Sequence, residues 1–186
     1  METTRSLIFI TGGVRSGKSS FAEKLAIQLA TGSSRSLHYI ATGERSDSEM
    51  EKRIQKHRQQ RKESESQWTT WEQPRNIGTL ATHFSDDDIL LLDCLTTLLN
   101  NELFSTGADQ QSSMNAILQG IEALSRCCHT LIIVSNEVLN EPIQDNQLVF
   151  TYKKVLGHLH QMIVQRALRA YLVESGVEIE MKGEIP

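Results

Sequence analysis

The stretch Gly12-Gly13-Val14-Arg15-Ser16-Gly17-Lys18-Ser19 constrains the fold more than any other part of the chain. It follows the apolar run 7–10 and precedes residues 19–30, whose apolar positions have helical spacing, so the local order is strand, glycine-rich loop, helix. The spacing G-x-x-x-x-G-K-S in that order is typical of a phosphate-binding loop. Backbone N–H groups of such a loop, together with the helix N-terminus, attract phosphate oxygens. The alternative is a tight strand-to-helix turn that binds nothing.

The residue types in this stretch have separate expected tasks. Glycines at positions 12 and 17 allow a tight turn and a close approach of the backbone to a ligand. Lys18 would reach the β- and γ-phosphates, and the Ser19 hydroxyl would bind Mg²⁺. Asp93 ends an apolar strand and could complete the Mg²⁺ shell, although a strand-final aspartate is also a common helix cap. Beside a phosphate-binding loop, the metal role is favoured.

Strand-like and helix-like segments alternate along most of the chain. The expected strands are 7–11, 37–41, 68–72, 89–93, 130–134, 171–174 and 177–180; the expected helices are 19–30, 47–63, 75–84, 96–104, 114–126 and 146–170, with a loop at 105–113. This order predicts an α/β fold of the P-loop NTPase type: a three-layer sandwich with a mostly parallel sheet and helices on both faces. The last two strands predict a C-terminal antiparallel hairpin. We expect one nucleotide-binding domain over 1–186.

Composition excludes several classes of function. The net charge of the 186 residues is −4, which gives no electrostatic basis for nucleic-acid binding. No apolar run approaches the roughly 20 residues of a membrane span, and residues 1–5 lead directly into the first strand, without a secretory signal. Cys94, Cys127 and Cys128 lack the number and spacing of a disulfide framework or a zinc site. We therefore expect reduced thiols and a cytoplasmic protein.

The predicted helix 47–63 carries few apolar residues and several basic ones. Arg53, His57 and Arg61 are four residues apart and share one face, with Arg58 beside them. Two guanidinium groups that flank an imidazole could hold a phosphate. The alternative is a charged surface helix exposed to solvent.

Several stretches together resemble one family, the bifunctional adenosylcobinamide kinase / adenosylcobinamide-phosphate guanylyltransferase of cobalamin biosynthesis. They occur in the family's order across almost the whole chain. The stretches are T-G-G-V-R-S-G-K-S at 11–19, Y-I-A-T at 39–42, E-M at 49–50 with R-I-Q-K-H-R at 53–58, Trp68 and Glu72, L-D-C-L-T-T at 92–97 through Asn100, and S-N-E-V at 135–138. The loop alone is common to many enzymes, whereas its combination with R-I-x-x-H-R is much more specific.

The resemblance implies two reactions. The γ-phosphate of ATP or GTP passes to the aminopropanol hydroxyl of adenosylcobinamide, and GTP then transfers GMP to that phosphate through a covalent guanylyl-histidine at His57. We expect Lys18 to be the other catalytic residue and Arg53 to neutralise phosphate charge. The implied nucleotide contacts are residues 12–19 with Thr42, Gly43, Glu44, Arg58, Gln59, Gln60, Arg61, Glu72 and Asp93. We expect Ser19 and Asp93 to hold Mg²⁺. The resemblance also implies a homo-oligomer, such as a trimer.

The chain departs from the family pattern after residue 138. The stretch 139–147 lacks the family's glycines, Phe150 stands where an arginine is expected, and His160 precedes Gln161 in place of an asparagine. Two other functions remain open on the residues alone. One is a P-loop kinase for another small hydroxyl substrate, and the other is a nucleotide-binding protein without catalytic activity.

Overall fold

The structure is a computed structural model that describes residues 5–43, 67–104, 107, 109–138 and 146–183. The helix expected over 47–63 lies outside the described residues. The elements are β1 (Ser6–Gly12), α1 (Lys18–Ala30), β2 (Ser36–Ala41), β3 (Trp68–Glu72), the 3₁₀ helix η1 (Ile77–His83), β4 (Asp88–Asp93), α3 (Leu95–Phe104), α4 (Gln110–Cys127), β5 (Thr130–Asn136), α5 (Gln147–Arg166), β6 (Arg169–Glu174) and β7 (Val177–Lys182).

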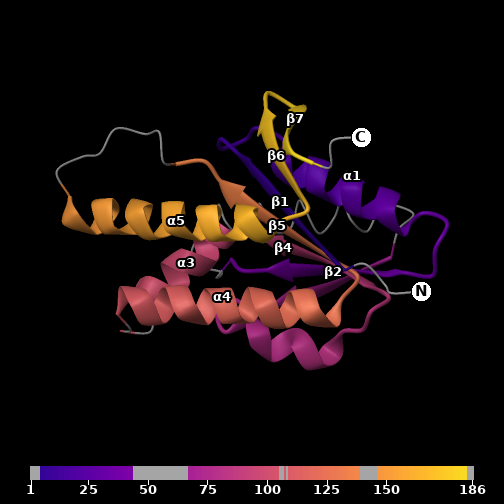
Figure 1. Cartoon of the computed structure of the whole chain (residues 1–186), viewed down its shortest axis with the longest axis horizontal. Helices are drawn as coiled ribbons and strands as arrows, with labels where there is room; N and C mark the ends of the chain where they lie inside the picture. The colour runs from indigo at the N-terminus through magenta and orange to yellow at the C-terminus, as the bar shows by residue number, and fades with distance from the viewer. Residues whose placement is uncertain (1–4, 44–66, 105–106, 108, 139–145, 184–186) are drawn as a thin grey trace.

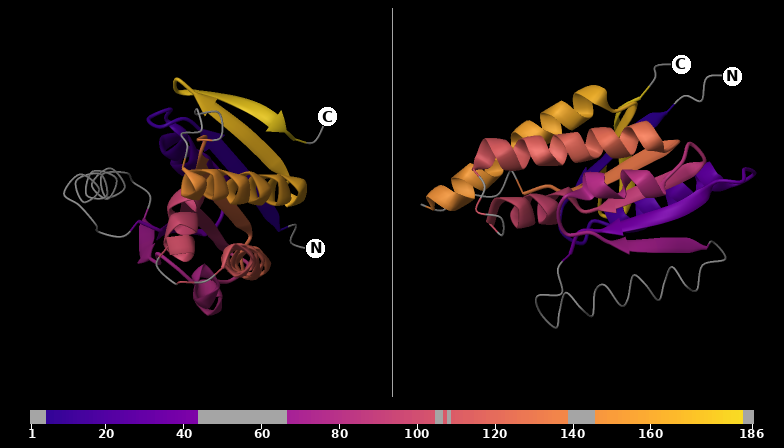
Figure 2. Two further views of the ribbon diagram at one scale, coloured as in Figure 1. Left: turned by 90° about the vertical axis from the view of Figure 1, so that its left-hand side faces the viewer. Right: turned by 90° about the horizontal axis from the view of Figure 1, so that it is seen from below.

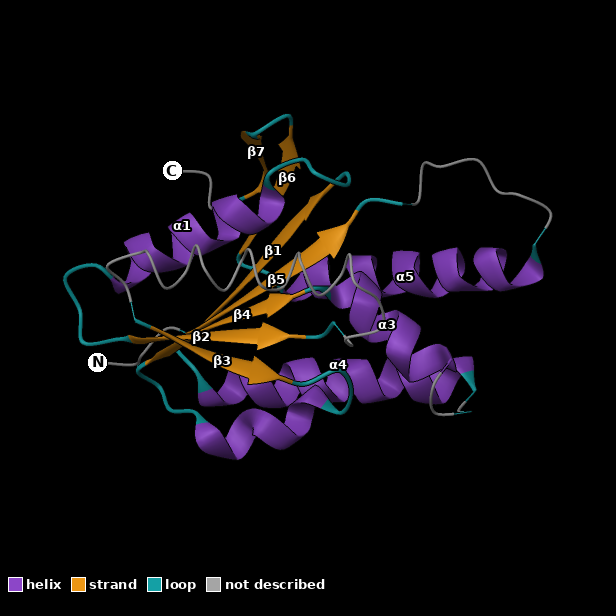
Figure 3. Ribbon diagram, turned by 180° about the vertical axis from the view of Figure 1, so that it is seen from behind, coloured by secondary structure: helices purple, strands orange, loops and turns teal. Residues whose placement is uncertain are grey.

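The strands form one seven-stranded sheet in the order β3-β2-β4-β5-β1-β6-β7 (Figure 1). Neighbours from β3 to β6 are parallel, and among the described strands only β7 runs antiparallel, paired with β6. Figure 3 shows the arrowheads of β2, β3, β4 and β5 pointing toward the same edge. The predicted α/β fold and terminal hairpin are confirmed. Ligand sites of open parallel sheets lie outside this carboxyl edge.

Alternate residues of the central strands enter two separate cores. In β1, Leu7 and Phe9 pack into one core, and Ile8 and Ile10 pack into the other. Strands β4 and β5 divide their apolar residues in the same way, as expected for strands that are covered on both faces. The first core contains residues of η1, α3, α4 and α5, whereas α1 contributes to the second. Figure 2 shows α4 and α5 side by side. Within the described ranges, no helix is long and apolar enough to cross a membrane.

The main differences between the predicted and the observed elements concern three helices. Residues 110–113, expected as loop, begin α4, because the Asp109 carboxylate accepts hydrogen bonds from the N–H groups of Gln111 and Ser112 and caps the helix. The helix expected over 146–170 ends at Arg166, and residues 169–170 belong to β6, which pairs with β1. The helix expected over 75–84 is the shorter 3₁₀ helix η1.

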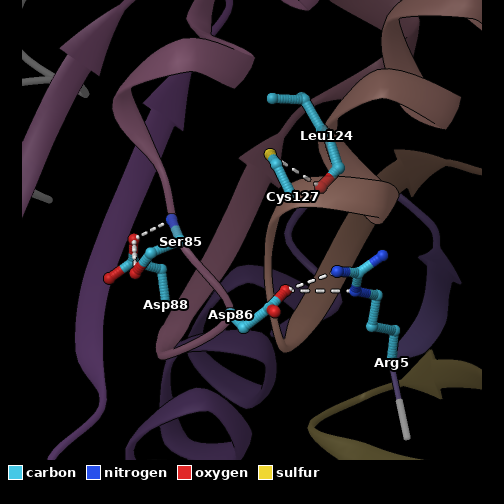
Figure 4. A network of polar contacts seen from close by, with 6 residues as sticks. All are labelled: Arg5, Ser85, Asp86, Asp88, Leu124 and Cys127. Atoms are coloured by element: carbon cyan, nitrogen blue, oxygen red, sulfur yellow. Dashed lines mark hydrogen bonds and ion pairs between the residues drawn. The ribbon is translucent and has the colours of Figure 1, made fainter. Parts of the chain in front are cut away.

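The acidic run before β4 has a structural role at the amino edge of the sheet (Figure 4). The Asp88 carboxylate accepts hydrogen bonds from Ser85 N–H and its hydroxyl, at 2.7 and 3.2 Å, and closes the turn into β4. Asp86 forms an exposed ion pair with Arg5 at 2.7 Å. The described residues contain no cluster of three or more acidic, histidine or cysteine side chains suited to a metal ion. This run therefore organises the turn at the edge opposite to the predicted site.

Candidate active site

The glycine-rich loop leaves β1 at the carboxyl edge and is shaped by two glycines. A Cβ added at Gly12 would lie 2.3 Å from the Val173 carbonyl oxygen, so no side chain fits where β1 meets β6. Gly17 has a φ of 94°, a left-handed conformation that glycine adopts without strain. Arg15 also has a positive φ, of 61°. The loop thus has the tight backbone that a phosphate cradle requires.

Lys18 and Ser19 lie in the first turn of α1. Both are buried, and the Lys18 ammonium group donates a hydrogen bond of 2.9 Å to the Gly13 carbonyl oxygen. This contact holds the lysine side chain back along the loop. The Phe21 N–H bonds to the Gly17 carbonyl oxygen, which starts the helix directly after the loop. A helix N-terminus with its partial positive charge therefore opens where the loop would hold phosphate.

Asp93 ends β4 two strands away from β1, since β5 lies between them. One carboxylate oxygen accepts a 2.8 Å hydrogen bond from the Tyr39 hydroxyl. None of the described hydrogen bonds joins the Asp93 carboxylate to the backbone of α3. The structure therefore does not support Asp93 as the N-terminal cap of α3. A carboxylate and the Ser19 hydroxyl are hard oxygen donors, which suit Mg²⁺. The donor chemistry of these two residues therefore fits the expected metal.

The Thr42 hydroxyl forms hydrogen bonds inside the protein. Thr42 is fully buried, and its hydroxyl donates to the Cys94 carbonyl oxygen and accepts from the Cys94 N–H, both at 2.8 Å. The Asn101 amide donates to the Thr42 carbonyl oxygen at 2.9 Å. These bonds fix the chain after β2 against the chain after β4. Thr42 therefore supports the position of Gly43, which is only half-buried, at the same edge.

A second polar network, which was not predicted from the sequence, follows β4 and β5. The Asn136 amide donates to the Thr96 hydroxyl at 3.0 Å, and this hydroxyl lies 3.0 Å from the Cys94 sulfur. The Tyr152 hydroxyl donates to the Thr96 carbonyl oxygen at 2.8 Å, and burial raises the pKa of Tyr152. The polar residues at two strand ends were the available sequence signal.

A buried histidine, His160, contacts the carboxyl end of β5. Ser135 is fully buried in β5, and its hydroxyl lies 2.8 Å from His160 Nε2. The His160 ring packs edge-on against Phe9 with ring centroids 5.0 Å apart. Burial lowers the pKa of His160 to about 4, so the imidazole is neutral near pH 7. His160 therefore positions the end of β5, where the Glu137 N–H bonds to the Gly12 carbonyl oxygen at 2.8 Å.

The structure divides the predicted contacts into two groups. Residues 12–19 gather at the end of β1, whereas Thr42, Gly43 and Glu72 follow β2 and end β3. Strands β5 and β4 lie between β1 and β2, which is three strand spacings, or roughly 14 Å. The remaining predicted site residues lie outside the described residues: Glu44, Arg53, His57, Arg58, Gln59, Gln60 and Arg61.

Similarity to known proteins identifies the family of this chain. The model of a family described as cobinamide kinase / cobinamide phosphate guanyltransferase matches residues 8–181. The chain belongs to this family. Two relatives named bifunctional adenosylcobalamin biosynthesis protein CobU, from Escherichia coli (strain K12) and Salmonella typhimurium, are 33% and 34% identical to it. Each alignment covers 95% of this chain and 99% of the relative. CobP of Pseudomonas aeruginosa, with the same descriptive name, is 35% identical over 94% of this chain and 96% of its own.

A solved structure supports the fold independently of these sequences. The flagellar accessory protein FlaH from Methanocaldococcus jannaschii superposes with a TM-score of 0.51 at 13% identity, over 96% of this chain and 79% of FlaH. Likeness at this identity concerns the arrangement of strands and helices alone. The family membership therefore rests on the sequence relatives, and the sheet topology is what FlaH shares.

Proposed function

We propose that the chain is a transferase with two activities at the carboxyl edge of its sheet. The first passes the γ-phosphate of ATP or GTP to the aminopropanol hydroxyl of adenosylcobinamide. The second transfers GMP from GTP to that phosphate and gives adenosylcobinamide-GDP. The proposal rests on the glycine-rich loop, where buried Lys18 donates a hydrogen bond to the Gly13 carbonyl oxygen, and on the membership of the chain in this family. The names of the relatives support both activities.

In the phosphoryl transfer, the protein mainly positions and neutralises the triphosphate. Residues 12–17 offer backbone N–H groups, and Lys18 leaves its contact with the Gly13 carbonyl oxygen to follow the β- and γ-phosphates. Ser19 and Asp93 would hold Mg²⁺, which neutralises phosphate charge when bound. The substrate hydroxyl loses its proton to solvent as its oxygen attacks the γ-phosphorus, the bond from the γ-phosphorus to the β-phosphate oxygen breaks, and a nucleoside diphosphate leaves.

In the guanylyl transfer, a ring nitrogen of His57 attacks the α-phosphorus of GTP. The bond between the α-phosphorus and the bridging oxygen breaks, pyrophosphate leaves, and a phosphoramidate remains on the histidine. A phosphate oxygen of adenosylcobinamide phosphate then displaces the imidazole. We assign neutralisation of phosphate charge to Arg53. We assign contacts with the guanine nucleotide to Gly43 and Glu72 at the ends of β2 and β3, where buried Thr42 holds Gly43 in place, and to Glu44, Arg58, Gln59, Gln60 and Arg61.

We infer a cytoplasmic location for these reactions. The cysteines at positions 94, 127 and 128 are all free thiols, and burial raises the pKa of Cys128 to about 12, which keeps it protonated. Reduced thiols are the usual state in that compartment. ATP and GTP, the proposed nucleotide substrates, are used there.

The test is replacement of Lys18 by alanine. Lys18→Ala removes a positive charge that is needed in the transition state, so kcat/KM for phosphorylation of adenosylcobinamide should fall by about a hundredfold or more. The assay follows labelled γ-phosphate into the corrinoid. Lys24→Ala is the matched control, because Lys24 is an exposed lysine on the same helix. Wild-type activity in Lys18→Ala would exclude the loop as the phosphate site.

A further inference from the structure

The two groups of predicted nucleotide contacts lie far apart along the sheet edge. A nucleotide whose phosphates lie on the loop therefore has no assigned site for its nucleoside. The triphosphate lies on residues 12–19, but the guanine contacts near Thr42 and Glu72 are three and four strands away from β1. We propose that the nucleoside of the phosphoryl donor lies on the other side of the loop, in a cleft between the loop and the β6–β7 turn. This inference rests on the proposed function of the loop.

The cleft lies at the same carboxyl edge, where β6 follows β1 in the sheet. It has a volume of about 430 Å³ and is lined by the loop residues 13–16, by Glu137, and by residues 172–175. This volume falls within the range of roughly 300–1,000 Å³ that small-molecule sites occupy. The predicted nucleotide contacts included only the loop side of this cleft.

The two walls of the cleft are joined by direct contacts. The Gly176 N–H in the β6–β7 turn donates a 2.8 Å hydrogen bond to the Ser16 carbonyl oxygen. A Cβ added at Gly17 would lie 3.4 Å from the Gly176 Cα, so the turn packs directly on the loop. The close approach of Gly12 to Val173 joins the same elements at the base. The cleft is therefore a preformed feature of the described structure.

A buried polar group in the wall points to a ligand. Ser16 is 9% exposed, and its hydroxyl is buried without a hydrogen-bond partner among the described residues. Buried hydroxyl groups are normally satisfied, and an unpaired one in a native site requires an explanation. A nucleotide held by the loop supplies phosphate and ribose oxygens that can accept this hydrogen bond.

The remaining lining suits a nucleoside better than additional phosphate. The carboxylates of Glu137 and Glu174 would repel phosphate, but they accept hydrogen bonds from ribose hydroxyls and from base N–H groups. Leu172 and the exposed Val14 provide apolar surface for the flat face of a base. The negative end of the cleft thus complements the positive phosphate loop and orients the nucleotide.

The experiment compares two ligands by titration calorimetry on the full chain in Mg²⁺. A non-hydrolysable ATP analogue uses the loop and the cleft, whereas inorganic tripolyphosphate uses the loop alone. Leu172→Trp fills the cleft and should weaken the ATP analogue at least about tenfold, and Glu174→Ala should weaken it several-fold. Both variants should bind tripolyphosphate like the wild type. Glu178→Ala, an exposed carboxylate on β7 outside the cleft, is the control.

The outcomes separate the assignment of the cleft to the nucleoside from the assignment of the loop to the phosphates. Unchanged affinity for the ATP analogue in both cleft variants would overturn the cleft assignment while leaving the loop as the phosphate site. If Leu172→Trp weakens both ligands, the loop has been disturbed and Glu174→Ala decides. Lys18→Ala should weaken both ligands. If it weakens neither, the proposed function and the cleft assignment fail together.

Discussion

Asp93 has a carboxylate oxygen bonded to Tyr39, and its charge is assigned to Mg²⁺ in the proposed mechanism. Asp93→Asn keeps an oxygen that can accept the Tyr39 hydrogen bond but removes the charge, and a neutral amide is a poorer partner for Mg²⁺. We expect the folded protein to need a higher Mg²⁺ concentration for half-maximal phosphorylation, with a lower maximum. The measurement is activity against Mg²⁺ concentration.

Tyr39→Phe is the matched control, because it removes the hydroxyl that holds Asp93 and leaves the carboxylate charged. Its Mg²⁺ midpoint should shift less than that of Asp93→Asn. An unchanged midpoint and maximum in Asp93→Asn would contradict the metal role and leave the residue with a structural one.

His160 should make the stability of the fold depend on pH. Burial lowers its pKa from 6.5 to about 4, so between these pH values the unfolded chain binds a proton that the folded protein does not. Stability therefore falls as the pH drops from about 6.5 to about 4, by at most about 3 kcal/mol from this residue. His160→Gln keeps a group able to bond the Ser135 hydroxyl but does not titrate.

The measurement is the free energy of unfolding in urea for wild type and His160→Gln between pH 7 and pH 4. The advantage of the wild type should shrink as the pH falls, because only the wild type loses this contribution. A difference between the two proteins that stays constant over this range would contradict the depressed pKa.

At the scale of elements, α4 and η1 approach so closely that a glycine is required between them. A Cβ added at Gly120 would lie 2.6 Å from Ile77 Cγ1 and 3.1 Å from the Gly78 nitrogen. Gly120→Ala would gain up to about 1 kcal/mol of helix propensity, but overpacking typically costs roughly 1–3 kcal/mol. We expect net destabilisation in chemical denaturation. Gln119→Ala, exposed on the same turn, should change stability little. A stabilised Gly120→Ala would show that η1 moves away freely.

The strands were predictable because their signal is local. β4 and β5 are continuous apolar runs of β-forming residues, which is what a strand covered on both faces requires. Helix ends were harder, because single contacts decide them. Asp109 extends α4 toward its N-terminus through a cap, and pairing with β1 takes residues 169–170 into β6. Such contacts depend on the tertiary structure and leave little trace in periodicity.

For the candidate site too, local features could be predicted from the sequence and contacts between distant segments could not. The glycine-rich loop is contiguous in sequence, so its residues could be singled out together from one stretch. The Thr96 network and the cleft beside the β6–β7 turn join segments distant in the chain, such as Asn136 with Thr96 and Gly176 with Ser16. Their proximity follows from the strand order, which alternating strands and helices alone do not specify.

At the scale of the whole molecule, the sheet places the glycine-rich loop after β1 at one position along its carboxyl edge, and Gly43 and Glu72, which we propose as guanine contacts, at another. This separation fits an enzyme that performs two transfers with two nucleotide-handling regions. We therefore expect that a substitution can remove one activity without the other. The central claim is that guanylyl transfer proceeds through His57, whereas phosphoryl transfer proceeds from the loop.

The most direct test is incubation of wild type and His57→Ala with GTP labelled at the α-phosphorus, alongside assay of corrinoid phosphorylation. The wild type should carry an acid-labile, base-stable label, as expected of a phosphoramidate. His57→Ala should carry none and lose guanylyl transfer, while phosphorylation survives because direct transfer of the γ-phosphate needs no histidine intermediate. Lys56→Ala, at the neighbouring position, should label like the wild type. Label that persists in His57→Ala and disappears in Lys56→Ala would contradict the account.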